Sequence, residues 1–459
     1  MLDIPTNDFL QNSQLDNNEE AESLRKKIID LVKDYFFLVH KKSKFVPGES
    51  FIPYSGKVFD EKEIQFLISS GLDFWLTTGR FNEKFQEKLA QFLGRNFVIT
   101  TNSGSSANLL ALSSLTSNLL GDKAIKPNDE VITVAASFPT TVNPILQNNL
   151  IPVFLDIDIP TYNIDSTLIE SAITEKTKAI MIAHMLGNPF DLEKIKKIAE
   201  DNNLWLIEDC CDALGGMYDG KLVGTFGDVS TFSFYPAHQI TMGEGGAVTT
   251  NNPKIKRSIE SFRDWGRDCF CAPGKNNTCG KRFNWKLGDL PEGFDHKYIY
   301  SHVGYNLKLT DMQAAVGLAQ LEKLETFVQT RQNNFSYLKK KLAKFEEFLI
   351  LPEATRNSDP SWFGFPITIK QNKSFSREDL VFFLSKNNVD TRTIFSGNIT
   401  KQPYFENKKY KIIEKLSNTD TMMNDTFMVG VFPGLTTEML DYVISQFENF
   451  FRSLEDTNS

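Results

Sequence analysis

The chain has 459 residues, of which 41% are hydrophobic and 24% charged, and its formal net charge is −8. This length is enough for a large hydrophobic core and a second, smaller domain. The acidic balance argues against nucleic-acid binding, because nucleic-acid binders present clustered basic side chains. A membrane span needs about 18 consecutive apolar residues, and no stretch of the sequence approaches that length.

The N-terminal region, residues 1–20, is acidic and rich in Asn, and we expect it to be disordered. It lacks the basic start and the apolar stretch of a signal peptide, so a cytoplasmic location is the default expectation. From about Glu20 to His40, apolar residues recur at helical spacing and predict one long helix that covers part of a core or a dimer surface. The apolar positions are Leu24, Ile28, Leu31, Tyr35 and Leu38.

From about residue 60, helical stretches such as Glu83–Leu93 alternate with short β-rich runs, which predicts an α/β domain around a mostly parallel sheet. Ligands of such sheets bind outside the carboxyl ends of the strands, and most of the motifs below directly follow a strand. The predicted strands are Phe97–Thr101, Glu130–Val134, Ile151–Leu155, Ala179–Ala183, Trp205–Ile207, Val229–Phe234 and Ala247–Thr250.

The second half of the sequence begins with an interruption. Residues 263–305 are rich in Gly, Pro, Asn, Trp and Cys and show little periodicity, which is typical of a functional or ligand-ordered loop. A single helix is predicted from Thr310 to about Lys340, followed by a mixture of short strands and helices. We therefore expect an N-terminal extension over residues 1–50, a large cofactor-binding domain over 51–325, and a smaller domain over 326–459.

Two motifs point to a phosphorylated, ring-containing ligand. Small residues in the segment 101–112, among them Gly104, Ser105 and Ser106, open a helix after a strand and form a candidate phosphate cradle. The strand of segment 205–216 ends in Glu208 and Asp209, and a carboxylate there can pair with a protonated pyridine nitrogen. Each motif also has a plainer interpretation, as an ordinary helix cap.

A third segment, 230–248, contains Ser-Phe-Tyr-Pro-Ala-His, ending at His238. In this order, the three segments resemble the sugar aminotransferases (DegT/DnrJ/EryC1/StrS) among the fold type I enzymes that use pyridoxal phosphate. In that family a Ser-Phe-Tyr-x-x-Lys run supplies the lysine that binds the cofactor covalently. The resemblance implies an α/β fold of the aspartate aminotransferase type, with a mostly parallel central sheet and a smaller C-terminal α+β domain.

The resemblance also implies roles for individual residues. Asp209 pairs with the pyridine nitrogen, Asp212 bonds to the 3-hydroxyl of the cofactor, and Phe138 stacks on its ring. Asn306 is similar to the asparagine that reaches the phosphate of the neighbouring subunit, which implies a homodimer with shared active sites. The remaining implied contacts are Gly104, Ser105, Ser106 and Ser233 to the phosphate, and Arg392 to the nucleotide sugar, although Arg392 is equally well explained as a surface residue.

Histidine in place of lysine changes the expected chemistry. Imidazole forms no stable imine with the cofactor, but it acts as an acid or base near neutral pH. We therefore expect pyridoxamine phosphate, held without a covalent bond. The substitution resembles a family branch, the 3-dehydrases of 4-keto-6-deoxy nucleotide sugars, in which the histidine removes a proton from C4′ of the cofactor and the sugar loses its C3 hydroxyl. The alternative is a catalytically silent binding protein.

The cysteines discriminate within that branch. Cys211, Cys269, Cys271 and Cys279 have the spacing C-x57-C-x-C-x7-C, which resembles that of the CDP-4-keto-6-deoxyglucose 3-dehydrase family and its 2Fe–2S cluster. We expect the cluster to lie beside the cofactor ring, because Cys211 follows Asp209 closely. A tetrahedral zinc site and free buried thiols are the alternatives. The fifth cysteine, Cys210, is expected to be a core residue.

The resemblance then implies a complete reaction. Electrons pass through the cluster to the dehydrated sugar, and a 4-keto-3,6-dideoxy sugar results, for the 3,6-dideoxyhexoses of O-antigen lipopolysaccharide. An NAD(P)H-dependent flavin or iron–sulfur reductase is the expected partner, because the sequence has no dinucleotide-binding glycine fingerprint. The rival within the family is a cluster-free, glutamate-dependent GDP-4-keto-6-deoxymannose 3-dehydratase. An ordinary aminotransferase is disfavoured by His238.

Overall fold

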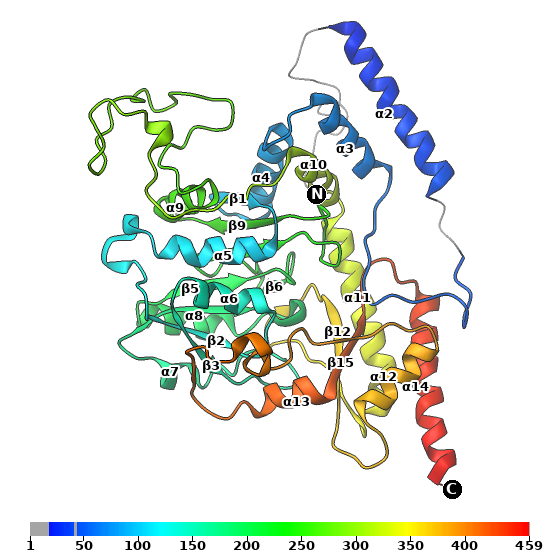
Figure 1. The fold of residues 1–459 in the computed structure, drawn as a ribbon. Helices are drawn as coiled ribbons and strands as arrows, with labels where there is room; N and C mark the ends of the chain where they lie inside the picture. Colours follow the sequence, from blue (N-terminus) through cyan, green and yellow to red (C-terminus); the bar gives the residue numbers. More distant parts are fainter. Residues whose placement is uncertain (1–17, 41–43, 459) are drawn as a thin grey trace.

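The seven predicted β-rich runs and one strand that was not predicted, β14, form an eight-stranded sheet in the computed structural model, which describes residues 18–40 and 44–458 (Figure 1). The strand order is β1-β9-β8-β5-β4-β2-β3-β14, and all neighbours are parallel except β9, which is antiparallel to β1 and β8. The strands are β1 (Phe97–Thr101), β2 (Glu130–Val134), β3 (Ile151–Leu155), β4 (Thr177–Ala183), β5 (Trp205–Asp209), β8 (Val229–Ser233), β9 (Gly246–Thr250) and β14 (Lys411–Ile412).

Both faces of this sheet are covered by helices, so its strands carry apolar side chains on both faces. Ile180 and Ile182 of β4 face one hydrophobic core, whereas Ala179 and Met181 face another. The first core is closed by α4 (Arg80–Leu93), α8 (Leu192–Asp201) and α10 (Asp311–Leu321). The second is closed by α5 (Gly104–Leu115), α6 (Pro139–Gln147) and α9 (Pro253–Arg263), of which α5 and α6 lie in front of the sheet in Figure 1.

A second, antiparallel sheet organises the C-terminal part of the chain around its own core. Its order is β10-β12-β15-β13, and it packs with three helices into one hydrophobic cluster. The strands are β10 (Leu349–Ile350), β12 (Gly364–Ile369), β13 (Arg392–Thr393) and β15 (Thr426–Gly430), and the helices are α11 (Leu324–Leu342), α12 (Arg377–Lys386) and α14 (Thr437–Asn458). Two short helices, α7 (Ile169–Ala172) and α13 (Ser417–Asp425), and a small sheet of β6 (Met217–Tyr218), β7 (Lys221–Leu222) and β11 (Ser358–Asp359) complete the fold.

The predicted N-terminal helix is present as α2 (Glu19–Val39), and most of the expected disordered segment lies outside the described residues. α2 packs on α3 (Glu61–Asp73) through Arg25, Ile29 and Phe36. The apolar positions that predicted it point elsewhere: Leu31 and Leu38 are 64% and 72% exposed. Within one chain the stripe therefore covers no core, and the other expected role, covering a dimer surface, stays a prediction.

The single helix predicted from Thr310 to about Lys340 is also wrong, because the structure contains two helices, α10 and α11, joined at Glu322 and Lys323. No Gly or Pro marks the break in the sequence. Contacts with the start of α3 hold it instead: Lys323 pairs with Asp60 and Glu63, and Lys62 pairs with Glu322 at 2.7 Å. The break lets α10 serve the first core and α11 the second.

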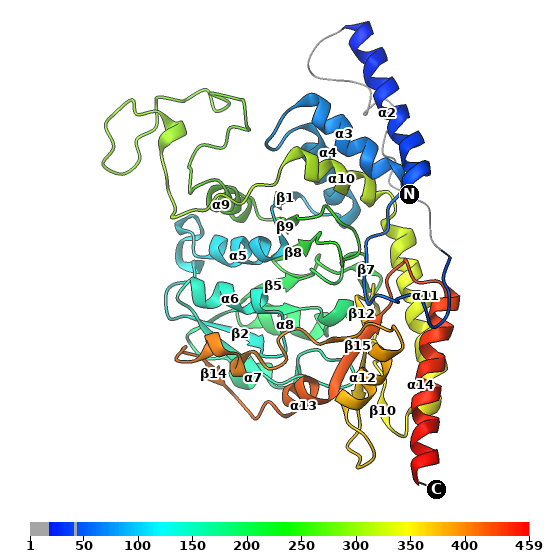
Figure 2. The same cartoon turned by 45° about the vertical axis from the view of Figure 1, so that its right-hand side comes forward.

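Residues 263–305 form the irregular loop that their composition predicts, and in Figures 1 and 2 this loop projects from the body of the protein beyond α9. Its two arms meet at the base, where Asp264 bridges to Asn306 and Arg267 to Tyr300. Among the described residues, no helix is both long and apolar enough to cross a membrane.

Candidate active site

A cavity of about 540 Å³ opens at the carboxyl ends of the parallel strands. Residues that follow β1, β2, β4, β5 and β8 form one wall, which is where open α/β sheets bind their ligands. Phe363, Arg392 and Met428, in or beside strands of the four-stranded sheet, form the other wall. Both sheets therefore contribute to the site.

One end of the cavity is built to hold an anion. Ser103 caps α5 by accepting a hydrogen bond from the N–H of Ser106 at 3.1 Å, and the hydroxyl-bearing Ser103, Ser105 and Ser233 all line the cavity. The helix N-terminus adds its partial positive charge. Gly104 is needed for close packing, because a Cβ there would collide with the Cβ of Ser233. Ser106 bonds to Ser103 and is not among the lining residues.

Asp209, at the end of β5, lies almost fully buried at the floor of the cavity. Its Oδ2 accepts hydrogen bonds from Asn108 Nδ2 at 2.8 Å and from Thr141 Oγ1 at 2.7 Å, and its Oδ1 accepts one from the N–H of Cys211 at 3.1 Å. Thr231 in turn donates to Asn108 at 2.6 Å and fixes the amide. The carboxylate is thus held in one orientation, which suits pairing with a ring nitrogen.

His238 lines the cavity beside Asp212, with its Nδ1 at 3.3 Å from Oδ1 of that residue. Burial raises the pKa of Asp212 above its usual value, and the contact with His238 offsets only part of that effect. The imidazole also packs on the ring of Phe363, at 5.3 Å between ring centroids. With Nδ1 turned toward Asp212, Nε2 is the ring nitrogen left for proton transfer in the cavity.

Arg331, a fully buried residue of α11, holds the backbone around His238. Its guanidinium donates to the carbonyl oxygens of Ala237 and His238 at 3.2 and 3.0 Å, and to those of Trp362 and Phe363 at 3.1 and 3.3 Å. Burial lowers the pKa of Arg331 to about 10, opposed by the charge of Asp212. Arg331 therefore links the backbone at His238 to the backbone at Phe363 on the opposite wall of the cavity.

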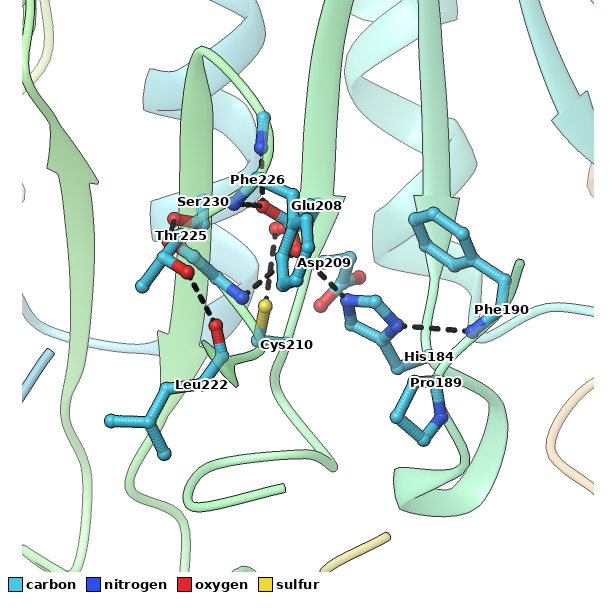
Figure 3. Close-up of polar contacts among 12 residues, drawn as sticks. His184, Pro189, Phe190, Glu208, Asp209, Cys210, Leu222, Thr225, Phe226 and Ser230 are labelled. Carbon is cyan, nitrogen blue, oxygen red and sulfur yellow. Dashed lines mark hydrogen bonds and ion pairs between the residues drawn. The ribbon is translucent and has the colours of Figure 1, made fainter. Parts of the chain in front are cut away.

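A second buried cluster adjoins the cavity through His184, which is one of its lining residues. In this cluster, shown in Figure 3, one ligand atom each of His184, Glu208 and Cys210 lie within 4.8 Å of one another. His184 Nε2 contacts Glu208 at 3.2 Å, and its Nδ1 accepts the N–H of Phe190 at 3.3 Å. Burial would raise the pKa of Glu208, but hydrogen bonds from His184 and from backbone N–H groups outweigh it and lower the pKa. Because these groups bond to one another, the cluster braces β4 against β5. Cys210 is a core residue, as expected.

Two further predicted residues lie at the mouth of the cavity. Phe138, which is 48% exposed, packs edge-on against Phe395 at 5.7 Å between ring centroids and lines the cavity, where it can stack on a ring. The half-exposed Arg392 lies over the ring of Tyr54 at 4.4 Å and pairs with Asp390. Asn306 is not among the lining residues; its side chain accepts a hydrogen bond from Lys308 at 2.9 Å.

The four predicted cluster ligands divide into two groups within the chain. Cys211 lines the large cavity, where its Sγ lies 3.0 Å from the position of a Cβ on Gly104. The other three thiols line a small cavity in the projecting loop, together with Arg282, His296 and Lys297. Within one chain, the described thiols therefore do not form a four-sulfur site.

Sequence reasoning missed the residues that orient the predicted ones. Asn108 and Thr141 hold Asp209, Ser103 caps the cradle, and Arg331 anchors His238. Ser103 and Asn108 lie inside the segment 101–112, and Asn108 lies one helical turn after Gly104, on the same face of α5. Thr141 lies three residues after the predicted Phe138. Arg331 had no sequence signal, because its four acceptors come from other parts of the chain.

Known proteins are similar to this chain in sequence. The profile of the DegT/DnrJ/EryC1/StrS aminotransferase family matches residues 58–448. The lipopolysaccharide biosynthesis protein RfbH of Salmonella typhimurium is 62% identical over 431 residues, covering 94% of this chain and 99% of that protein. The dTDP-4-dehydro-2,6-dideoxy-D-glucose 3-dehydratase of Saccharopolyspora spinosa is 49% identical over 435 residues, covering 94% of this chain and 93% of the other.

The fold has close counterparts among solved structures. The Escherichia coli GDP-4-keto-6-deoxy-D-mannose 3-dehydratase with bound hydrated PLP superposes with a TM-score of 0.77 at 29% identity, covering 86% of this chain and 99% of that one. The predicted α/β fold of type I is confirmed by this match and by the mostly parallel central sheet.

Proposed function

Because this chain belongs to the DegT/DnrJ/EryC1/StrS aminotransferase family, we propose that it removes the C3 hydroxyl of a CDP-linked 4-keto-6-deoxyhexose. Relatives that bear the names of nucleotide-sugar 3-dehydratases support C3 deoxygenation of a keto-deoxysugar as the reaction class. The observation that carries the proposal is His238, an imidazole with a carboxylate partner where transaminating relatives have a lysine. The name of the Salmonella relative supports a place in lipopolysaccharide synthesis.

Pyridoxamine phosphate is the proposed cofactor, and the residues present fit it. The hydroxyls of Ser103, Ser105 and Ser233 and the start of α5 suit its phosphate, and Asp209, held by three donors, suits its pyridine nitrogen. When bound, the cofactor supplies an amine for the C4 ketone of the sugar and a ring that accepts electrons. Phe138 lines the same cavity and is the proposed stacking partner of the ring.

The protein contributes a base, His238, that is held in position and forms no covalent bond to the cofactor. His238 moves a proton through Nε2 while Asp212 faces Nδ1 and stabilises the charged imidazolium. Arg331 keeps the carbonyl oxygens of residues 237 and 238 in place, so the imidazole does not need to reorganise during the reaction. Loss of the C3 hydroxyl as water then leaves a sugar that must gain two electrons and two protons to become the 3-deoxy product.

We propose NAD(P)H, acting through a separate flavin or iron–sulfur reductase, as the source of those electrons, and a 2Fe–2S cluster on Cys211, Cys269, Cys271 and Cys279 as their entry point. The cysteine spacing supports the cluster and, by resemblance, the CDP group. The four thiols do not meet within one chain. Arg392 is the proposed contact for the diphosphate, because its planar guanidinium matches phosphate oxygens.

The test is an anaerobic preparation, reconstituted with pyridoxamine phosphate and assayed with CDP-, dTDP- and GDP-linked 4-keto-6-deoxyhexoses. The proposal expects a 3-deoxy product from the CDP sugar only when NADH and a reductase are added, together with about two irons and two acid-labile sulfides per chain. Turnover of the GDP sugar with glutamate and without iron would support the cluster-free rival. Absence of any cofactor absorbance or sugar-dependent change would support a silent binding protein.

A further inference from the structure

The three cysteines of the loop are anchored to their own chain, away from Cys211. Asp268, next to Cys269, accepts from His296 at 2.6 Å and from Ser301 at 2.7 Å, and it contacts Arg257 in the middle of α9 at 3.7 Å. β9 ends at the edge of the sheet opposite the cavity, and α9 runs from there back toward the cavity edge. Arg257, in the middle of α9, therefore lies between the two edges. The cysteine cavity and the large cavity have no lining residue in common.

The base of the loop leaves little freedom to swing toward Cys211. The two arms cross so closely that a Cβ on Gly266 or on Gly304 would overlap the opposite backbone. His302 is fixed on both ring nitrogens, by Ser117 and by Ser261, each at 2.8 Å. Moving the cysteines into the cavity of their own chain would require these contacts to break.

The loop nevertheless presents an apolar surface to solvent. Tyr298 and Tyr300 are 57% and 53% exposed, and Val303, between the anchored His302 and the crossing Gly304, is 92% exposed. Single exposed apolar side chains are common, whereas clustered ones mark contact surfaces, and these three lie within the short segment 298–303. Cys211 is itself partly exposed and lines the wall of the large cavity.

We propose that the iron–sulfur site is completed between two copies of this chain: Cys269, Cys271 and Cys279 of one copy meet Cys211 of the other. This inference rests on the proposed function, which supplies the cluster. It accounts both for the division of the four thiols into two cavities and for the exposed side chains on the loop that carries three of them. The active site is then incomplete in a monomer.

Mixed dimers carrying two different affinity tags test the arrangement without using activity. One dimer pairs a Cys211→Ala chain with a Cys271→Ala chain. The matched dimer pairs a chain that carries both substitutions with an unchanged chain, so the two preparations have the same composition. Iron, acid-labile sulfide and the visible absorption of the cluster are measured, and circular dichroism and cofactor absorbance verify folding.

An intersubunit site predicts one intact cluster, with about two irons, in the first mixed dimer and none in the second. A site within one chain predicts the reverse and would overturn the inference, as would equal iron in both dimers or iron in a monomeric protein. If the unchanged protein itself contains no iron after anaerobic purification, the proposed function fails first and this inference with it. Those results are distinguishable because the unchanged homodimer is measured alongside.

Discussion

At the scale of single residues, the identity of the side chain at position 238 decides whether the cofactor is tethered. His238 lies in the cavity wall with Asp212 at 3.3 Å. Replacing His238→Lys places a primary amine there, which can bind pyridoxal phosphate covalently. We expect a new absorption band that borohydride makes permanent, and a loss of dehydration of at least about a hundredfold, the usual contribution of a general base.

The control for that variant is His238→Asn, which removes the base but offers no nucleophilic amine. It should lose dehydration to a similar extent and show no borohydride-stable band. Dehydration that survives in either variant at close to the original rate would mean that another group removes the proton.

The buried carboxyl of Asp212 predicts a dependence of stability on pH. Its pKa is raised above the usual value of 3.8, chiefly by burial, so the folded protein holds this proton more tightly than the unfolded chain does. The free energy of unfolding should therefore fall as the pH rises above 3.8 through the folded-state pKa. In urea titrations across that window, Asp212→Asn should flatten the fall.

A matched substitution, Asp219→Asn, removes one exposed negative charge and measures the effect of net charge alone. If it flattens the pH dependence as much as Asp212→Asn does, the titration of Asp212 is not the cause.

At the scale of secondary-structure elements, the start of α5 gives the most direct prediction. A Cβ on Gly104 would collide with Ser233, which belongs to the same anion-binding end of the cavity. Gly104→Ala should therefore weaken cofactor binding at least about tenfold, or by ~1.4 kcal/mol, in an equilibrium titration of pyridoxamine phosphate. Gly71→Ala in α3 is the control, because no atom lies within 4 Å of its added Cβ.

Sequence periodicity predicted the strands better than the helices. The bounds of β1, β2 and β3 were predicted correctly to the residue, because turn residues on both sides of a short apolar run show where the strand begins and ends. The break between α10 and α11 was missed because it depends on Lys323 pairing with Asp60 and Glu63, more than 250 positions away in the sequence. The sequence left a core and a dimer surface as alternatives for the apolar stripe of α2, because a helical period does not say which partner covers it.

At the scale of the whole molecule, Val303 gives a prediction about assembly. We propose a homodimer in which the loop carrying this 92% exposed side chain is covered by the second copy. Val303→Asp would bury a charge at that contact, so the dimer dissociation constant should rise at least about tenfold in sedimentation equilibrium. Phe382→Asp is the control, since Phe382 is 61% exposed on α12, far from the loop in Figures 1 and 2. Equal weakening by both variants would contradict a specific role for the loop.

The predicted site residues differ in how the fold places them. Asp209 and Ser233 are the last residues of two strands of one sheet, and His238 lies in the turn after the second of them. The parallel topology alone brings them to one edge. Cys211 and Cys271 could not be placed in the same way, because a spacing pattern carries no information about the path of the 57 residues between Cys211 and Cys269. The position of the loop depends on Arg257, His296 and His302, whose partners no motif reveals.

The last strand of the large sheet has a practical consequence. β14 comes from the C-terminal part of the chain, yet it pairs with β3 and closes that border of the eight-stranded sheet. A fragment that ends near residue 325 would lack β14, so β3 would become an edge strand with unpaired backbone N–H and C=O groups. Such a bare strand invites pairing with other molecules, so a fragment of this kind should precipitate on expression, and the large sheet is best studied with the C-terminal segment attached.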